Sequence, residues 1–333
     1  NKKIIDFKEH NLHVVGYSVP VNKNIQLKDL KQRIYTLKNQ PNAIPYVTSY
    51  YKKFWGFCME YRKYKKLKDK FYKVFIDSKF KKGFLNYGEV FFPGKKKKEI
   101  LFSTYVCHPS MANNEVSGPS LSVFISRYVK QLKSRNYSYR FIFIPETIGA
   151  IAYINKNLKK LKNNVYAGFN LSCMGDNRNY SYIPSRNGNT IADKVATHIL
   201  YWTNKNYKKY SWLDRGSDER QFCSPGVNLP LCTLMRTKFG EYKEYHTSLD
   251  KLGTVVKADG FKGSYQVTIR IIEAIENNFF YKSIHKCEPQ MSKRNLYPNI
   301  SQAGNINKEI AFLMNILSLC DGKNSLLDIA DFL

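Results

Sequence analysis

The chain has 333 residues, of which 43% are apolar, a composition typical of a globular protein with a large hydrophobic core. Its formal net charge of +28 permits electrostatic binding of nucleic acid, but the lysine runs lack interleaved aromatic residues, so we expect no nucleic-acid partner. No run of about 18 apolar residues occurs, so neither a transmembrane helix nor a membrane partner is predicted.

The first 95 residues are a region of predicted β-structure. Residues 11–19 alternate between apolar and polar side chains as a strand does, whereas residues 26–37 have the apolar spacing of a helix. Residues 72–78 and 84–92 are predicted strands, joined by a turn of lysine and glycine. We therefore predict that residues 20–95 form a small β-rich unit.

From residue 99 the sequence alternates between predicted strands and predicted helices. The strands cover residues 100–106, 139–144, 165–173 and 229–235. The helices cover residues 117–132, 148–158, 190–203 and 260–277. Because each strand leads into a helix, the predicted fold class is α/β, with a mostly parallel sheet and helices on both of its faces.

The region after residue 280 has a different pattern. Residues 287–305 are predicted to be a linker, residues 307–319 an amphipathic helix, and residues 325–333 the start of another helix after Gly322. Two short helices around an Asp-Gly turn either begin a winged-helix module or form a packing appendage. We assign residues 283–333 to a linker and a partial module of this kind.

The cysteines and the two ends of the chain bear on where the protein works. Seven cysteines, an odd number without the spacing of a disulfide framework, favour a reducing, cytoplasmic compartment. The sequence starts at Asn1 and stops in mid-pattern at Leu333, so we expect it to be a piece of a longer protein. The oligomeric state stays open, and a homo-oligomer is one alternative.

The strongest functional signal lies where the strand at residues 100–106 ends. His108 follows that strand, and Asn114 and Glu115 precede the next helix. Open α/β sheets place their ligands at the carboxyl ends of strands, and His246 lies in a similar polar segment downstream. Two imidazoles with nearby carboxylates suggest a metal site. The alternatives are a hydrogen-bonded His108 in the core and a Glu115 that stabilises a helix start.

Further candidate residues follow other predicted strands. Glu146 comes after the strand at residues 139–144, where it could serve as a general base on a metal-bound water or as a helix-start carboxylate. Asp218 could orient a ligand histidine, and Arg220 could hold a substrate carboxylate or pair with Asp218. Tyr245, like Asp218 and Arg220, is predicted to support the site or to contact the substrate.

Nucleophilic catalysis is not favoured by the sequence. No nucleophile elbow, phosphate loop or dinucleotide glycine motif occurs. Cys107 stands beside His108, but adjacent residues on a strand point to opposite faces, so we do not expect them to act as nucleophile and base.

Four motifs carry a resemblance to a known family. In order, the chain has CHPSMANNEVSG, PETIGAIAYI, GSDERQFCSPG and EYHTSLDKL, and the segments IPYVTSYYKKFWGFC and GEVFFPG match an inserted β-rich domain. The chain thereby resembles aminopeptidase-like proteins related to zinc-dependent aminopeptidases and glutaminyl cyclases. The resemblance implies a three-layer α/β/α zinc-peptidase fold. Its catalytic domain would comprise residues 1–19 and 96–282, with an insertion at 20–95 and a truncated winged helix at 283–333.

The resemblance also implies roles for individual residues. His108 and His246 match the two histidine ligand positions of the superfamily, and Glu146 matches its general-base glutamate. By the same match, a zinc ion would be bound by these histidines and one carboxylate, for which we choose Glu115, with Asn114 as the rival ligand.

The chain departs from the family pattern at three positions. The metal-bridging aspartate falls on Asn114, the second glutamate of a Glu-Glu pair falls on Thr147, and a ligand aspartate falls near Ser172. These departures favour one zinc ion over two.

The function implied is a zinc-dependent hydrolase of amide or peptide bonds, aminopeptidase-like, acting through activated water on a peptide or small amide. Similar proteins are often linked to surface-polysaccharide synthesis, so an amide on an amino-sugar precursor is an alternative substrate. A catalytically degraded scaffold that serves as a binding or regulatory module is the alternative from a different class.

Overall fold

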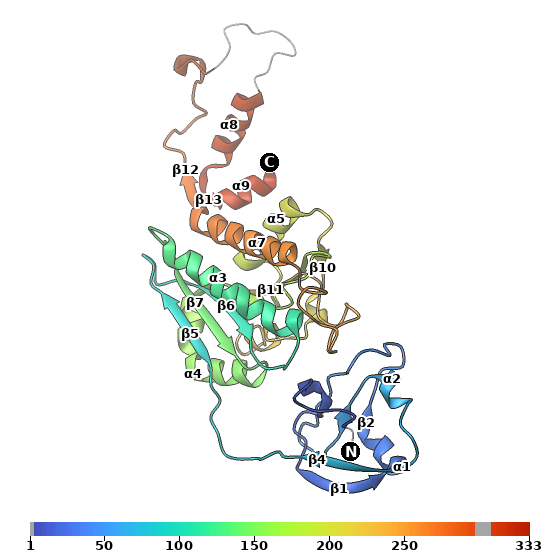
Figure 1. The fold of residues 1–333 in the computed structure, drawn as a ribbon. Coiled ribbons are helices and arrows are strands. Elements are labelled where there is room, and N and C mark those ends of the chain that lie inside the picture. Colours follow the sequence, from blue (N-terminus) through green and yellow to red (C-terminus); the bar gives the residue numbers. More distant parts are fainter. Residues whose placement is uncertain (1–2, 297–307) are drawn as a thin grey trace.

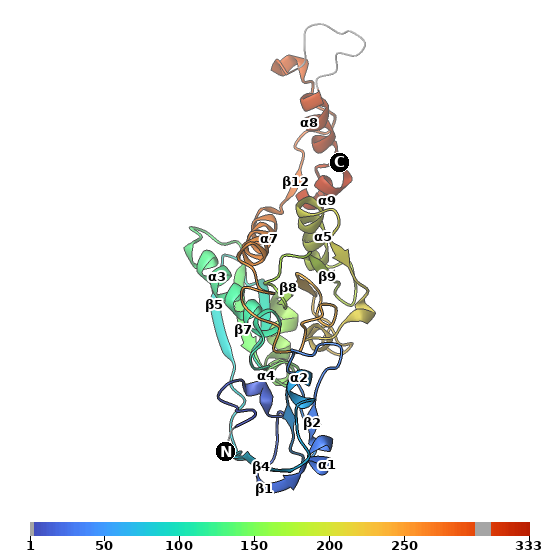
Figure 2. The ribbon, with the colours of Figure 1, turned by 45° about the vertical axis from the view of Figure 1, so that its right-hand side comes forward.

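The computed structural model describes residues 3–296 and 308–333. A small N-terminal unit lies at one end of the molecule, a large α/β unit in the middle, and a C-terminal unit at the other end (Figures 1 and 2). Within the described residues, no helix combines the length and apolar character needed to cross a membrane.

The large unit is built on a seven-stranded sheet with the order β10-β9-β11-β8-β6-β7-β5. Its strands are β5 (Gly88–Phe92), β6 (Glu99–Tyr105), β7 (Ser138–Ile144), β8 (Val165–Leu171), β9 (Ser181–Ile183), β10 (Lys208–Lys209) and β11 (Leu231–Met235). The central strands β11, β8, β6 and β7 are parallel to one another. β5 is antiparallel to β7, β9 is antiparallel to β11, and β10 is parallel to β9. The predicted α/β class with a mostly parallel sheet is confirmed, with mixed pairing toward the edges.

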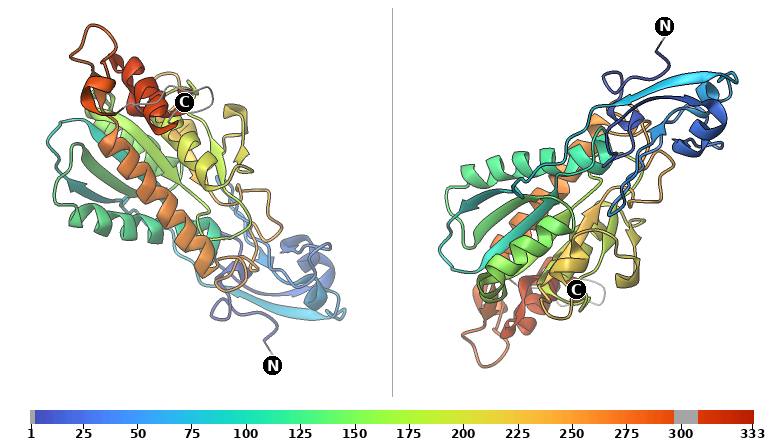
Figure 3. Two further views of the ribbon diagram at one scale, coloured as in Figure 1. Left: turned by 90° about the horizontal axis from the view of Figure 1, so that it is seen from above. Right: turned by 90° about the horizontal axis from the view of Figure 1, so that it is seen from below.

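Helices cover both faces of this sheet, as the views from above and below show (Figure 3). One face packs against α3 (Ser117–Gln131), α5 (Ile191–Thr203) and α7 (Ala258–Asn277); the other packs against α4 (Ile148–Asn164) and α6 (Glu219–Phe222). Adjacent residues of β6 divide between the layers, because successive strand side chains point to opposite faces. Phe102 packs with Leu121 and Ile271, whereas Leu101 packs with Ile154.

The small N-terminal unit contains two short pairs of strands. Its elements are η1 (Asn11–His13), β1 (Val21–Gln26), α1 (Leu27–Leu30), η2 (Lys31–Arg33), β2 (Ile34–Tyr35), β3 (Phe57–Cys58), α2 (Tyr61–Tyr64) and β4 (Phe71–Ile76). The predicted helix at residues 26–37 is wrong beyond its first turns, because the chain straightens at Ile34 and pairs with Phe57. Leu30 and Ile34 still pack in one small core, so their apolar spacing reflects burial without a continuous helix.

The predicted boundaries of this unit also differ from the strand pairing. The strand predicted at residues 84–92 is β5, which pairs with β7 at the edge of the large sheet. Val14, expected with the large domain, bridges to Phe57 in the small unit. Residues 77–87, which have no regular secondary structure, connect the two units.

The C-terminal unit contains β12 (Phe280–Lys282), η5 (Ser292–Arg294), α8 (Lys308–Leu319), β13 (Asp321–Ser325) and α9 (Leu326–Phe332). β12 pairs antiparallel with β13, and α9 contacts α5 through ion pairs of Lys194 with Asp328 and of His198 with Asp331. The two predicted helices are present. Residues 297–305 of the predicted linker, and the first residue of the first predicted helix, lie outside the described residues.

Candidate functional site

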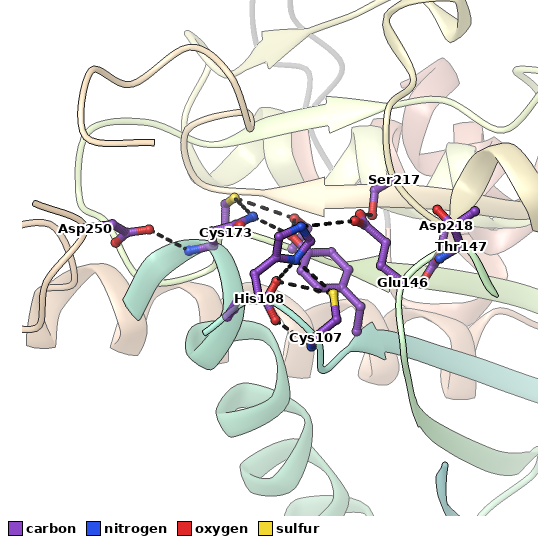
Figure 4. Close-up of polar contacts among 12 residues, drawn as sticks. Cys107, His108, Glu146, Thr147, Cys173, Ser217, Asp218 and Asp250 are labelled. Atoms are coloured by element: carbon purple, nitrogen blue, oxygen red, sulfur yellow. Dashed lines mark hydrogen bonds and ion pairs between the residues drawn. The ribbon is translucent and has the colours of Figure 1, made fainter. Parts of the chain in front are cut away.

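The candidate site lies at the carboxyl edge of the central sheet. His108 follows β6, Glu146 follows β7, and the last residues of these strands, Tyr105 and Ile144, are paired. His246 comes from the long loop between β11 and α7. Parallel strands that end at one edge gather their following loops there, so residues far apart in sequence meet (Figure 4).

Glu115 binds His108 on the Nδ1 side of the ring. Its Oε1 lies 2.5 Å from His108 Nδ1, and its Oε2 accepts a hydrogen bond of 2.9 Å from the backbone N–H of Cys107. A carboxylate at Nδ1 fixes the tautomer and ring orientation, and leaves Nε2 as the nitrogen that faces a ligand. The geometry therefore favours Glu115 as a residue that positions His108 over the ligand role expected from the sequence.

Cys107, His108 and Glu115 also form a compact cluster. Among the described residues, their Sγ, Nδ1 and carboxylate oxygen atoms are a group of three that could surround a cation, all within 4.8 Å. The Sγ–Nδ1 and Oε1–Nδ1 distances are 2.8 and 2.5 Å, however. Ligands of one tetrahedral zinc ion lie roughly 3.3 Å or more apart, because each bond is about 2.0–2.3 Å. In this arrangement the atoms of the cluster are hydrogen-bonded to one another and lie too close together to be ligands of one zinc ion.

Cys107 and His108 lie closer than the sequence argument expected. Both follow the end of β6, so the alternation of a strand does not separate their side chains. Burial and the nearby Glu115 carboxylate raise the pKa of the Cys107 thiol, which opposes formation of the nucleophilic thiolate. The exclusion of a cysteine nucleophile therefore rests on electrostatics and not on strand geometry.

Two polar side-chain atoms at the site are buried without hydrogen-bond partners among the described residues. They are His246 Nε2 and Asn114 Oδ1. The amide nitrogen of Asn114 donates to the Tyr105 hydroxyl at 2.8 Å, which directs the amide oxygen the other way. The rings of His108 and His246 lie 5.2 Å apart, centroid to centroid. Buried polar atoms are nearly always satisfied, so the Asn114 amide oxygen and the His246 tautomer with its proton on Nδ1 together fit a cation.

The protonation of His246 suits the same role. Burial and the neighbouring His108 lower the pKa of His246 to about 4. Burial also lowers the pKa of His108, but the hydrogen bond to Glu115 and the charges of Glu115 and Glu146 outweigh it, so the net shift is upward. A neutral imidazole is the form that binds metal, so His246 is ready to act as a ligand at neutral pH.

Glu146 faces His108 from the end of β7. Its Oε2 lies 3.8 Å from His108 Nε2, and its Oε1 accepts a hydrogen bond of 2.9 Å from the Ser217 hydroxyl. Burial raises the pKa of Glu146 above its usual value, since the charges of His108 and Arg220 and the bond from Ser217 only partly offset the desolvation. A half-buried carboxylate whose Oε2 accepts no hydrogen bond from the described residues has the properties of a general base.

Asp218 and Arg220 hold the turn that carries Glu146. Asp218 Oδ1 accepts a hydrogen bond of 2.8 Å from the backbone N–H of Thr147, and Arg220 donates to the Thr147 hydroxyl at 2.6 Å. Thr147 has a φ of 63°, which is rare for a β-branched residue and needs such support. Asp218 therefore contacts this turn and not a ligand histidine, and burial raises its pKa to about 8.

Aromatic residues enclose the histidines, and one of them comes from the small N-terminal unit. The Tyr46 ring makes edge contacts with His108 and His246 at centroid distances of 5.2 and 5.1 Å, and its backbone N–H donates to the His246 carbonyl at 2.9 Å. Tyr245 stacks on His246 at 3.8 Å. Tyr245 was expected at the site, whereas sequence spacing carries no signal for Tyr46, which lies 200 residues from His246 (246 − 46).

Asp250 flanks His246 in the sequence, where an acid suits a metal site and a helix start alike, and in the structure it joins two loops of the site. Its carboxylate accepts hydrogen bonds of 2.7 and 3.0 Å from the backbone N–H groups of Asn113 and Asn114, and a third from the Tyr242 hydroxyl. Asp250 thereby ties the loop of His246 to the loop of Asn114. Its place four residues after His246 was the only available hint.

Comparison with known proteins agrees with this fold. Residues 8–278 match the sequence profile of a domain of unknown function, DUF4910, and residues 279–333 match a winged helix-turn-helix. The chain belongs to the DUF4910 family. The second match confirms the predicted C-terminal winged-helix module.

Relatives of this family member carry the comparison further. One from Clostridium acetobutylicum, provisionally named a polysaccharide biosynthesis protein with an aminopeptidase-like domain, is 44% identical over 99% of this chain and 75% of its own length. A crystal structure of a provisionally named peptidase from the same organism has a TM-score of 0.91 at 42% identity, covering 100% of this chain and 75% of that one.

A solved structure with much lower sequence identity is similar to this chain in fold only. A zinc aminopeptidase from Bacillus subtilis has a TM-score of 0.52 at 16% identity, covering 72% of this chain and 63% of that one. The predicted aminopeptidase-like fold is confirmed.

Proposed function

We propose that this DUF4910 protein is a metal-dependent hydrolase of amide bonds. One zinc ion would be held by His108 Nε2, His246 Nε2 and Asn114 Oδ1, with Glu146 as the general base. The observation that carries the proposal is the pair of buried polar atoms, His246 Nε2 and Asn114 Oδ1, which lack partners among the described residues. They lie near His108, whose Nδ1 is hydrogen-bonded to Glu115. Asn114 replaces Glu115 as the preferred third ligand.

Zinc bound at this position supplies a Lewis acid that polarises a carbonyl group and favours deprotonation of water. The protein supplies the proton transfer. Glu146 Oε2 takes a proton from the attacking water, and later donates it to the leaving nitrogen as the C–N bond breaks. The Ser217 hydroxyl occupies the other oxygen, so the free oxygen is the one on the His108 side. The raised pKa of Glu146 makes it a stronger base near neutral pH.

Two observations bear on the substrate and on activity. The relative's name refers to polysaccharide biosynthesis, which supports an amino-sugar amide as the alternative to a peptide. The proposed ligand set carries no charge, since Asn114 is an amide, and this supports weaker metal binding than an aspartate would give. If the purified protein binds no metal and cleaves none of the substrates, it is instead a scaffold that has lost catalysis.

The test combines elemental analysis with amine release from dipeptides and N-acetylated amino sugars. We expect about one zinc per chain, lost in the double variant His108→Ala/His246→Ala together with hydrolysis. Glu146→Gln should keep zinc and lose roughly 100-fold or more in turnover. His285→Ala, at an exposed histidine in the C-terminal unit, is the matched control and should change neither property. Full turnover in Glu146→Gln, or zinc retained in the double variant, would overturn the proposal.

A further inference from the structure

A groove opens beside the candidate site, on the side of the small N-terminal unit. Its volume is about 510 Å³, within the range of small-molecule sites. Tyr46 and Pro109 are among its lining residues: Tyr46 contacts both histidines of the candidate site, and Pro109 follows His108. A molecule in the groove therefore lies next to the groups that would carry out hydrolysis.

The other lining residues combine exposed aromatic rings with positive charge. Tyr17 and Phe80 are 59% and 65% exposed. Tyr17 has a φ of 65°, which bulky residues rarely adopt and which is often found at functional sites. Lys79 and Lys81 also line the groove, and within the part of the chain that the structure describes neither forms an ion pair. Among residues 3–296 and 308–333, no aspartate or glutamate lines the groove.

We propose that this groove binds the phosphate-bearing sugar part of the substrate, a phosphorylated N-acyl amino sugar, an inference that rests on the proposed amide hydrolysis. The uncompensated lysines complement a phosphate dianion. The apolar face of a sugar ring packs on the flat faces of Tyr17 and Phe80. The N-acyl group then lies toward Tyr46 and the histidine pair. An acidic peptide shares the negative charge but has no ring to match both aromatic walls.

The experiment measures binding by calorimetry on the full chain after removal of metal with a chelator, so that neither turnover nor a bound ion contributes. The probes are N-acetylglucosamine 1-phosphate, uncharged N-acetylglucosamine, and the acidic dipeptide Ala-Glu. We expect the phosphosugar to bind at least about tenfold more tightly than either other probe. Lys79→Ala/Lys81→Ala and Phe80→Ala should each weaken that binding by about tenfold.

The matched control is Lys65→Ala/Lys66→Ala, which removes the same charge from two exposed lysines of the small unit outside the groove. An equal loss in this control would show that net charge alone attracts the ligand, and would overturn the inference. Tighter binding of Ala-Glu would replace the sugar with an acidic peptide. If the protein binds the phosphosugar but has no hydrolytic activity, the proposed function is overturned and the groove assignment stands. If the protein hydrolyses amides but does not bind the phosphosugar, the groove assignment is overturned and the proposed function stands.

Discussion

The two histidines of the candidate site are held in different ways. His108 has a charged partner, Glu115, which contacts Nδ1 at 2.5 Å. His246 lies between Tyr46 and Tyr245, and its Nε2 has no hydrogen-bond partner among the described residues. The first histidine is positioned by electrostatics, and the second by packing and by its backbone.

The two histidines therefore differ in two properties that matter for a metal ligand: the basicity of the ring and the pH range in which it is neutral. The hydrogen bond that His108 donates to Glu115, with the charges of Glu115 and Glu146, outweighs burial and raises the pKa of His108, so this ring competes for protons. Burial among aromatic rings lowers the pKa of His246, so this ring stays neutral to lower pH. Each histidine should therefore respond differently when its surroundings are changed.

The largest effect is expected from His246→Ala. Zinc affinity should fall roughly 300-fold, because about 10 kcal/mol of binding free energy, the lower end for protein zinc sites, shared by the three proposed ligands gives about 3.3 kcal/mol for each. Competition with a fluorescent chelator measures this loss. A change below about tenfold would show that His246 is not a ligand.

Glu115→Gln should have a smaller effect of about 10- to 100-fold on zinc affinity, since Glu115 orients a ligand and does not itself bind. The same titration applies. A loss as large as that of His246→Ala would restore Glu115 to the ligand set. The variant should also lower the pKa of His108, which is readable by NMR of the imidazole in metal-free protein.

Asn114→Asp should raise zinc affinity by about tenfold, because a carboxylate replaces a neutral amide oxygen at the proposed ligand position. The Tyr105 hydroxyl, which now accepts from the amide, can donate to the new carboxylate. Asn187→Asp, at an exposed asparagine, is the control for the added charge alone. Equal affinities for Asn114→Asp and the parent would remove Asn114 from the site.

The smallest effect concerns stability. The folded state lowers the pKa of His246 from 6.5 to about 4, so the neutral ring contributes stability that is present above pH 6.5 and lost as the pH falls from 6.5 toward 4. After discounting for partial exposure, metal-free protein should lose about 1 kcal/mol more than His246→Asn between neutral pH and about pH 5. Urea unfolding at both pH values measures the difference, and equal losses would contradict it.

The architecture was largely readable from the sequence. Alternating strands and helices are local patterns, so β6, β7, β8 and β11 and the long helices appear close to their predicted positions. The assignment failed where pairing is long-range. β5 joins the large sheet only because β7 offers an open edge, and its partners lie 47 to 55 residues later (Phe92 with Tyr139, 139 − 92; Gly88 with Phe143, 143 − 88). No property of residues 84–92 indicates that partner.

The sequence by itself determined which residues stand at the ends of strands, and so brought His108 and Glu146 to one edge, because strand position is encoded in local periodicity. Only the tertiary structure decided what each residue does there. It placed Glu115 at Nδ1 of His108, Asp218 at the backbone N–H of Thr147, and the Tyr46 ring against both imidazoles. The direction of each side chain decides which nitrogen of a histidine faces a ligand and which group a carboxylate contacts. Packing between segments far apart in the chain sets those directions, and no local sequence pattern records that packing.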